Sequence, residues 1–391
     1  MQHNITYYSI ILDFTPDVSH VEQLTIVIRY VSLEPDQKPE IHENFLGFIP
    51  IDSSTGEFLT NTLLEQLEIM KISIQNMRGQ GYDNGSNMKG KRVGVQKRIL
   101  DSRAFYVPCN SRTLNLVVND AALCCTEAVN IFSTVQEIYK FFSASTQRWK
   151  VLTNHVTSLT VKPLSKTRWS SRIDAITPLK YQAGEIYDAL FEISEDPTLD
   201  AFAKNTALSL AKKVKSYKFV YCLVLWYAIL VKINAVSKTL QKVHLNISEA
   251  TEQLKKVKVL LEKMRSDQGF QETLVDAREL YEELEIEPKF PLENTIRPRR
   301  KKRQSDYESA DDPILNPETA FKSNVYFVIL DSAIMAIKER FDLLYRHNEI
   351  FNFLYDVKKE DKNGLLKKCL KLEKNLTHED HSDIEGKQLF Q

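Results

Sequence analysis

Two aspartates, Asp13 and Asp83, have the residue type and the setting for metal chemistry in this chain of 391 residues. Asp13 ends the first apolar, β-branched segment, and Asp83 ends a short segment that precedes a glycine-rich loop. Two-metal nucleases need carboxylates from different strands that converge on Mg²⁺ ions about 3.5–4 Å apart. Loop aspartates are also commonly solvated or helix-capping, so the pair alone leaves both interpretations open.

The elements expected to position these acids form an α/β domain. Residues 5–13 and 22–31 are rich in β-branched and aromatic residues and flank a turn, which predicts two adjacent strands. A third short strand is expected at 44–51, and apolar residues at helical spacing predict a helix at 59–70. Three strands followed by a helix open a ribonuclease H-like domain, although many α/β folds share this start.

The loop at 78–90 is dense in glycine and asparagine and follows a predicted short strand. Loops at strand ends commonly carry functional residues. Helical patterns follow at 114–122 and 129–143.

Residues 173–281 show no strand pattern and are expected to be helical almost throughout. Ten apolar positions alternate spacings of three and four, which is typical of a heptad seam. We favour a coiled-coil hairpin within the chain over intermolecular dimerisation, because neighbouring helices associate without loss of translational freedom. The seam positions are Ile233, Val236, Leu240, Val243, Ile247, Ala250, Leu254, Val257, Leu261 and Met264.

Prolines and a change of charge interrupt the helical pattern at 291–318, which indicates a linker or long loop, and helical spacing resumes at 327–341. Six of the seven residues at 297–303 are basic. Such a run is compatible with a nuclear-import signal, a phosphate-binding stretch or a solvated loop.

Composition limits the classes of partner and compartment. The 52 basic and 52 acidic residues give no net charge that would attract a polyanion to the whole molecule. Nucleic-acid binding would therefore require a local patch of basic residues. Five scattered cysteines favour a reducing, intracellular compartment over a disulfide framework. The first residues do not have a signal-peptide pattern, and the apolar run 219–231 is shorter than the roughly 20 residues of a membrane span. We therefore expect a buried helix there and no membrane partner.

Several motifs, in order and spacing, resemble hAT-superfamily transposase domains of the kind found in zinc finger MYM-type protein 1-like sequences. The similarity covers nearly the whole chain, and the Gly-Gln-Gly-Tyr-Asp-Asn-Gly-Ser-Asn-Met string is specific. The motifs lie at 9–25, 77–90, 106–120, 167–170, 297–303, 330–334 and 339–341.

The resemblance implies that Asp13 and Asp83 are the first and second catalytic acids and Mg²⁺ ligands, with Asp17 as a fallback for the first. The family's third acid lies in a C-terminal glutamate-arginine motif, in a region that also dimerises, and that motif is not in this sequence. The glutamate strings at 338–341 and 383–386 match other parts of the family. The family also has a cysteine-x-x-histidine pair after the second acid, whereas here Cys109 is followed by Arg112. The family's N-terminal zinc-finger domain is likewise not expected.

Candidate nucleic-acid contacts follow from the same resemblance and from local charge. In the family an arginine-tryptophan pair contacts the transposon end, which corresponds here to Arg168 and Trp169; core packing is the alternative for Trp169. The remaining candidates are Arg297, Arg299, Arg300, Lys301, Lys302 and Arg303.

We therefore predict an α/β ribonuclease H-like core, a mixed five-stranded sheet with helices, interrupted by a large all-α insertion with a long heptad helix. The expected parts are the first core segment at 1–150, the insertion at 151–290, a basic, proline-containing linker at 291–320, and a helical return at 321–391.

The expected function is that of a truncated or degenerate hAT-like DNA transposase, ancestrally Mg²⁺-dependent and inactive as this chain. The alternatives are a non-enzymatic nuclear module that binds DNA or protein, and an incomplete gene model. We expect weak, non-specific DNA binding, a nuclear location, and homo-oligomers only through the family's C-terminal region.

Overall fold

The chain, seen in a computed structural model, forms two compact units. The first comprises Met1–Thr113, Leu240–Glu252 and Glu339–Gln391, and the second comprises Leu114–Thr239 and Gln253–Lys338. The structure describes residues 6–16, 18–19, 21–32, 38–83, 85–89, 94–99, 104–165, 170–242, 245–287, 290, 316–378 and 381–391.

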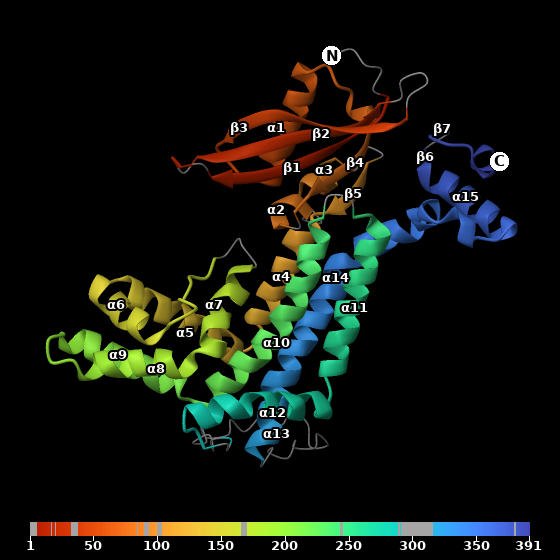
Figure 1. Cartoon of the computed structure of the whole chain (residues 1–391). Helices are drawn as coiled ribbons and strands as arrows, with labels where there is room; N and C mark the ends of the chain where they lie inside the picture. The colour runs from red at the N-terminus through yellow and green to blue at the C-terminus, as the bar shows by residue number, and fades with distance from the viewer. Residues whose placement is uncertain are drawn as a thin grey trace, which may run out of the picture. The chain divides into compact units, whose positions relative to one another are not determined.

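The first unit contains a five-stranded sheet with the strand order β3-β2-β1-β4-β5 (Figure 1). β1 pairs antiparallel with β2 and β2 with β3, whereas β4 lies parallel to both β1 and β5. The strands are β1 (Tyr8–Pro16), β2 (Glu22–Ser32), β3 (Glu40–Ile51), β4 (Met77–Tyr82) and β5 (Phe105–Pro108). The predicted mixed five-stranded, ribonuclease H-like sheet is confirmed.

One face of this sheet is apolar. Alternate residues of a strand point to the same side, and in β1 and β2 the residues on the buried side are apolar. Ile10 of β1 and Ile26 of β2 are fully buried in one cluster with Leu59 and Leu63 of helix α1 (Gly56–Ile69). The side chain of Thr55 caps α1 by accepting the N–H of Phe58. Each such fully buried aliphatic side chain contributes about 1.5–3 kcal/mol to stability. Three short helices also belong to this unit: η1 (Ile74–Asn76), α2 (Ser86–Lys89) and α3 (Val95–Arg98).

Helix α14 (Phe327–Phe351) ends in this unit beside β5. The ring of Phe105 lies edge-on to His347 and Phe351, with centroid distances of 5.9 and 5.4 Å. On β3, by contrast, Ile41, Phe45 and Phe48 each remain more than half exposed.

The C-terminal segment docks at the start of β4. The guanidinium of Arg78 forms a two-pronged ion pair with Asp383, through Nε at 2.5 Å and Nη2 at 2.9 Å. Both side chains are mostly buried, and the Arg78 guanidinium lies over the ring of Tyr7. The segment consists of η3 (Asn352–Tyr355), η4 (Val357–Lys359), α15 (Lys362–Leu376), β6 (Thr377–His378), β7 (His381–Ser382) and α16 (Gly386–Phe390).

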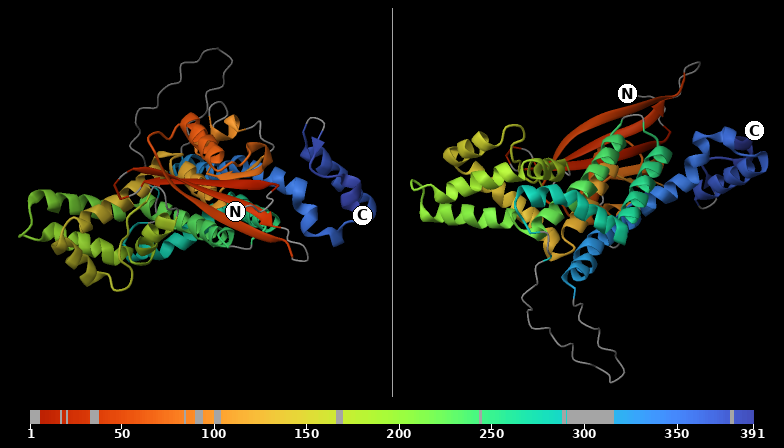
Figure 2. Two further views of the ribbon diagram at one scale, coloured as in Figure 1. Left: turned by 90° about the horizontal axis from the view of Figure 1, so that it is seen from above. Right: turned by 60° about the horizontal axis from the view of Figure 1, so that its bottom comes forward.

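The second unit is entirely helical in its described residues, as predicted. Helices α8 and α9 lie side by side as a hairpin, yellow-green in Figure 2. Elsewhere the ring of Phe270 packs against Tyr221 and Tyr326, each at 5.3 Å, and the Tyr326 hydroxyl donates to the carbonyl of Met264. Its helices, some of which continue into the first unit, are α4 (Asn110–Ala122), α5 (Thr126–Ser143), α6 (Thr146–His155), α7 (Ser170–Tyr181), α8 (Ala183–Glu195), α9 (Ala201–Val214), α10 (Tyr217–Leu240), α11 (Ile247–Met264), α12 (Asp267–Glu283), α13 (Pro317–Phe321), η2 (Lys322–Tyr326) and α14.

The heptad pattern does not form one long helix, which corrects the prediction. α10 ends at Leu240 and α11 begins at Ile247. Asn246 starts the second helix with a side-chain cap: its side-chain oxygen Oδ1 accepts the N–H of Glu249, and its side-chain amide donates to the Glu249 carboxylate. Seam residues on both sides, such as Ile233 and Leu254, are buried within the single chain, which supports an intramolecular seam.

The predicted part boundaries also differ from the two compact units. Residues 114–150, expected in the sheet domain, belong to the helical unit, because α5 packs against other helices of that unit. Most of the linker predicted at 291–320 lies outside the described residues, which resume at 316.

The apolar run at 219–231 lies in α10, as expected of a buried helix. By length and hydropathy, α10 and the continuous helix Pro317–Tyr355 could each cross a membrane, with mean hydropathies of 2.0 and 1.4. In α10, however, 67% of the most apolar window is buried within the protein. Core packing accounts for its hydrophobicity.

Leu254→Asp should destabilise the chain by more than about 3 kcal/mol, because it places a charge where a fully buried leucine packs. Thermal unfolding measures the change, and size-exclusion chromatography records the oligomeric state. Val259→Asp is a matched control on α11, since Val259 is 61% exposed and should tolerate the charge. Conversion of a dimer into an equally stable monomer by Leu254→Asp would show that the seam joins two chains instead.

His347 should make the first unit less stable in acid. Burial lowers the pKa of His347, so the folded state favours the neutral ring. Stability from this group is therefore complete above the ordinary histidine pKa of about 6.5 and declines as the pH falls toward the lowered value. Urea unfolding at pH 8 and pH 5.5 should show a smaller acid loss for His347→Phe than for the unmodified chain. Equal losses would rule out this contribution.

Candidate functional site

Asp13 lies within β1, three residues before the strand ends at Pro16 and not at its end as predicted, and Asp83 directly follows the parallel strand β4. The register pairs Ile11 of β1 with Gly81 of β4, and each aspartate follows two residues later. Adjacent strands are about 4.8 Å apart, so the two backbones approach closely at this end of the sheet. The strand pairing thus brings together the two acids that the sequence singled out.

The Asp13 carboxylate is exposed. It lies on β1 opposite Thr25 of β2, and its Oδ1 accepts the N–H of the next residue, Phe14, at 3.0 Å. The fallback acid Asp17 lies outside the described residues.

The Asp83 carboxylate is better enclosed, with 17% of its side chain exposed. Its Oδ1 accepts the N–H of Gly85 at 2.9 Å, which closes a tight turn after β4. Asn87 then donates to the carbonyl of Ser54, and Met88 is fully buried in the sheet core. Three residues of the Asp-Asn-Gly-Ser-Asn-Met string therefore have structural contacts: Asp83 and Asn87 form hydrogen bonds, and Met88 packs in the core.

Two buried tyrosines donate hydrogen bonds near the end of β4, and one of them holds the backbone of Asp83. The Tyr106 hydroxyl donates to the Asp83 carbonyl at 2.9 Å, and the Tyr82 hydroxyl donates to Gln80 at 2.8 Å. Burial raises the pKa of both hydroxyls, and the nearby Asp83 charge raises that of Tyr106 further. Both remain protonated donors at neutral pH. Sequence reasoning did not identify this support.

Arg112 supplies the charged neighbour of Asp83. It lies in the first turn of α4, and its Nε is 3.5 Å from Oδ2 of Asp83. The Cys109 N–H, which donates to the Tyr82 carbonyl at 2.9 Å, ties the start of this helix to the end of β4. The sequence showed Arg112 only as a departure from a histidine; its opposite charge to Asp83 was the available signal for pairing.

The fold is one that commonly binds Mg²⁺, but the described residues do not fit a two-metal site. Among them, no group of three or more His, Cys, Asp or Glu side chains could hold a metal ion. One Asp83 oxygen accepts an N–H, and the other faces a guanidinium. We therefore derive no metal-dependent step from this arrangement.

The glutamate at 385 belongs to a segment anchored elsewhere. Its neighbour Asp383 is held by Arg78 at the beginning of β4, whereas Asp83 follows the end of β4. Six extended residues separate these ends by roughly 16–20 Å.

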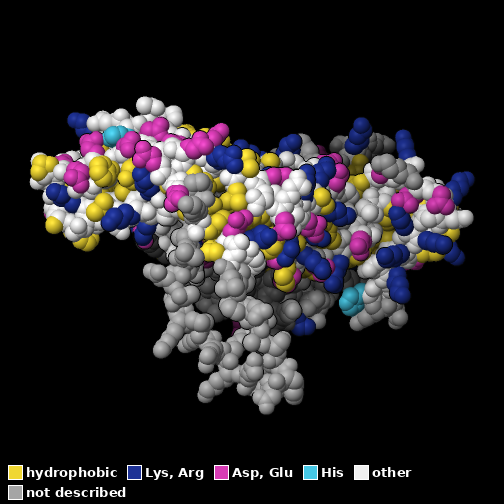
Figure 3. Space-filling view, turned by 90° about the horizontal axis from the view of Figure 1, so that it is seen from below, with side chains coloured by type: hydrophobic (Ala, Val, Ile, Leu, Met, Phe, Trp, Pro, Cys, Tyr) yellow, Lys and Arg dark blue, Asp and Glu magenta, His cyan; other side chains and the backbone are white. Residues whose placement is uncertain are grey.

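The predicted nucleic-acid contacts, Arg168, Trp169 and the basic residues at 297–303, lie outside the described residues. Over the face shown in Figure 3, basic and acidic side chains are interspersed.

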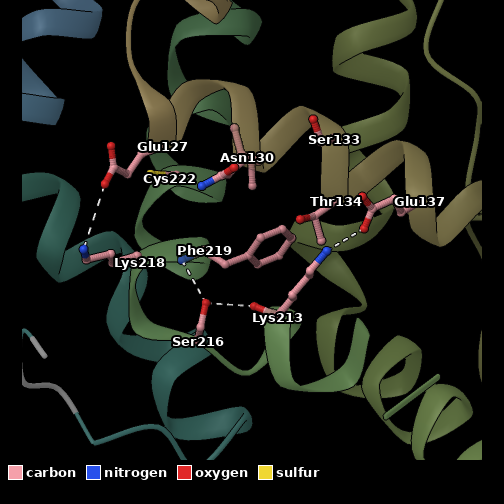
Figure 4. A pocket seen from close by; sticks show the side chains of 11 residues that line it. Glu127, Asn130, Ser133, Thr134, Glu137, Lys213, Ser216, Lys218, Phe219 and Cys222 are labelled. Atoms are coloured by element: carbon pink, nitrogen blue, oxygen red, sulfur yellow. Dashed lines mark hydrogen bonds and ion pairs between the residues drawn. The ribbon is translucent and has the colours of Figure 1, made fainter. Parts of the chain in front are cut away.

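A pocket of about 380 Å³ lies within the helical unit, between α5 and the α9–α10 turn (Figure 4). Its lysines already have acidic partners: Lys213 lies 2.6 Å from Glu137 and Lys218 lies 3.9 Å from Glu127. Burial raises the pKa of the Cys222 thiol in its wall. These ion pairs make the pocket a poor phosphate site.

Comparison with known proteins agrees with this fold. Residues 3–94 match the family model described as "ZMYM1/FAM200, RNase-like domain". The chain is 24% identical to the human 52 kDa repressor of the inhibitor of the protein kinase over 248 residues, which is 60% of this chain and 32% of the relative. It is 23% identical to the mouse protein of the same name over 351 residues, or 86% and 44%. The chain thus spans less than half the length of these curated relatives. Residues 3–94 therefore match a ZMYM1/FAM200 RNase-like domain, which confirms the predicted resemblance to zinc finger MYM-type protein 1-like sequences.

Proposed function

We propose that this chain is a transposase-derived nuclear module that binds DNA weakly and does not cleave it. The observation that supports this proposal best is the setting of Asp83, whose two carboxylate oxygens face a backbone N–H and the guanidinium of Arg112. Metal-dependent strand cleavage requires carboxylate oxygens that are free to bind two ions. The ancestral Mg²⁺ chemistry of cleavage and strand transfer is therefore not assigned to this chain.

DNA binding is proposed from the family match and the local charge at 297–303. Domains related to transposases suggest nucleic-acid partners. The chain has no net charge, so the strongest attraction to phosphates should come from this run of six basic residues. The same run would serve as the nuclear-import signal.

Protein binding is the second candidate, and the exposed side chains of β3 favour it. Ile41, Phe45 and Phe48 are 59%, 54% and 68% exposed, and the two phenylalanine rings touch edge to face. Apolar clusters of this kind commonly mark protein interfaces. Homo-oligomerisation through further sequence of a longer relative is a separate proposal.

The chain should show no Mg²⁺- or Mn²⁺-dependent cleavage of transposon-end DNA. Asp83 is paired with Arg112, and the described residues offer no group of three or more acidic, cysteine or histidine side chains that could hold the ions of the reaction. The assay is gel electrophoresis of end-labelled duplexes incubated with each metal. Metal-dependent nicking that disappears in Asp83→Ala would overturn the proposal.

DNA affinity should be non-specific and should collapse between low and physiological salt. Each phosphate contact adds about 0.9 to the magnitude of the slope of log K against log salt. Replacing Arg299, Arg300, Lys301 and Lys302 by alanine should therefore flatten the slope by several units in fluorescence-anisotropy titrations.

The matched control replaces three exposed lysines of α15, Lys367, Lys371 and Lys374, by alanine and should leave the slope nearly unchanged. Equal slopes for the unmodified chain and the 299–302 variant would place any DNA affinity elsewhere, with Trp169 as the next residue to test.

A further inference from the structure

The partner of Asp83 is a permanent cation supplied by the chain. Arg112 Nε lies 3.5 Å from Oδ2, and the arginine side chain is 39% exposed against 17% for Asp83. A guanidinium is a planar cation whose geometry suits a carboxylate. The Asp83 carboxylate therefore has a positive neighbour within the chain.

That neighbour competes with a divalent ion for the same oxygen. Mg²⁺ would have to lie about 2.0–2.1 Å from a ligand carboxylate oxygen, in near-octahedral geometry. At Oδ2 it would meet the guanidinium a few ångströms away, and two like charges at this separation repel strongly near a protein surface. Oδ1 already accepts the N–H of Gly85 at 2.9 Å, so only one of its lone pairs remains for an ion there.

The backbone around the pair is fixed on both sides. The Tyr106 hydroxyl holds the Asp83 carbonyl at 2.9 Å, and the first turn of α4 begins with the Cys109 N–H bonded to Tyr82. Asp83 and Arg112 thus face each other from two anchored segments, the turn after β4 and the start of α4. The ion pair therefore costs little additional backbone ordering.

We propose that Arg112 is the resident counter-ion of Asp83 and takes the place of a metal ion, so that this acid joins the β4 loop to α4 rather than ligating Mg²⁺. The inference rests on the proposed non-cleaving function and adds a structural role for both residues. It also predicts the opposite effect on stability when the charge of Asp83 is removed. In an empty metal site clustered carboxylates repel, so neutralising one stabilises the fold, whereas neutralising an ion-paired aspartate destabilises it.

The test is a double-mutant cycle on the full chain with Asp83→Asn, Arg112→Gln and the double variant, measured by urea unfolding at low salt. Asp83→Asn should raise the unfolding equilibrium constant about twofold to fivefold, and most of this effect should vanish when Arg112 is already glutamine. Additive effects, or stabilisation by Asp83→Asn, would overturn the proposal.

Two further measurements keep the result interpretable. Glu57→Gln, which breaks the more exposed contact of Glu57 with Arg98 at 3.3 Å in the same unit, should change the constant less than about twofold. If Asp83→Asn does not fold, the effect of magnesium on the stability of the unmodified chain tests the proposal. Millimolar MgCl₂ should stabilise it no more than NaCl of equal ionic strength, and a larger magnesium effect would overturn the proposal. DNA cleavage alongside strong coupling would refute the proposed function while leaving the ion pair intact.

Discussion

The parallel pairing of β1 with β4 is the constraint on which the site depends. It sets Asp13 and Asp83 at one end of adjacent strands, although 69 residues separate them in the sequence. The pairing requires glycine at position 79, because a Cβ there would lie 2.8 Å from the Cβ of Ser9. A larger side chain would separate the strands and with them the two acids.

Strand β4 carries one ion pair at its start and is followed by another after its end. At the start of β4, Arg78 and Asp383 join segments 305 residues apart in a largely buried ion pair. Past the end of β4, Arg112 faces Asp83. Breaking a buried pair by removing one partner leaves an uncompensated charge, so Arg78 and Asp383 restrict where the C-terminal segment can dock. Both arginines thus position backbone rather than perform chemistry.

Much of the fold could be predicted from local patterns. Segments rich in β-branched and aromatic residues predicted the first two strands, although β1 continues three residues past Asp13, to Pro16, instead of ending at that acid. The break between Leu240 and Ile247 was missed because the heptad spacing continues across it, whereas Asn246 and Glu249 restart the helix through a local cap. Periodicity records which side of a helix is apolar, but not whether the backbone is continuous.

The site was less predictable, because its contacts are not local. The pairing of Arg112 with Asp83 depends on the β4–β5 register and on the position of α4, neither of which is written in the spacing of these residues. The hydroxyl of Tyr106 reaches the Asp83 carbonyl for the same reason. Sequence comparison could show that arginine replaces a histidine; only the fold shows which charge it neutralises.

The most direct measurement is the anomalous difference map of a crystal of this chain soaked in MnCl₂. The account predicts a guanidinium of Arg112 against the Asp83 carboxylate, with no manganese peak within ligand distance of either Asp83 oxygen. A manganese peak shared by Asp13 and Asp83, with Arg112 turned away, would contradict it.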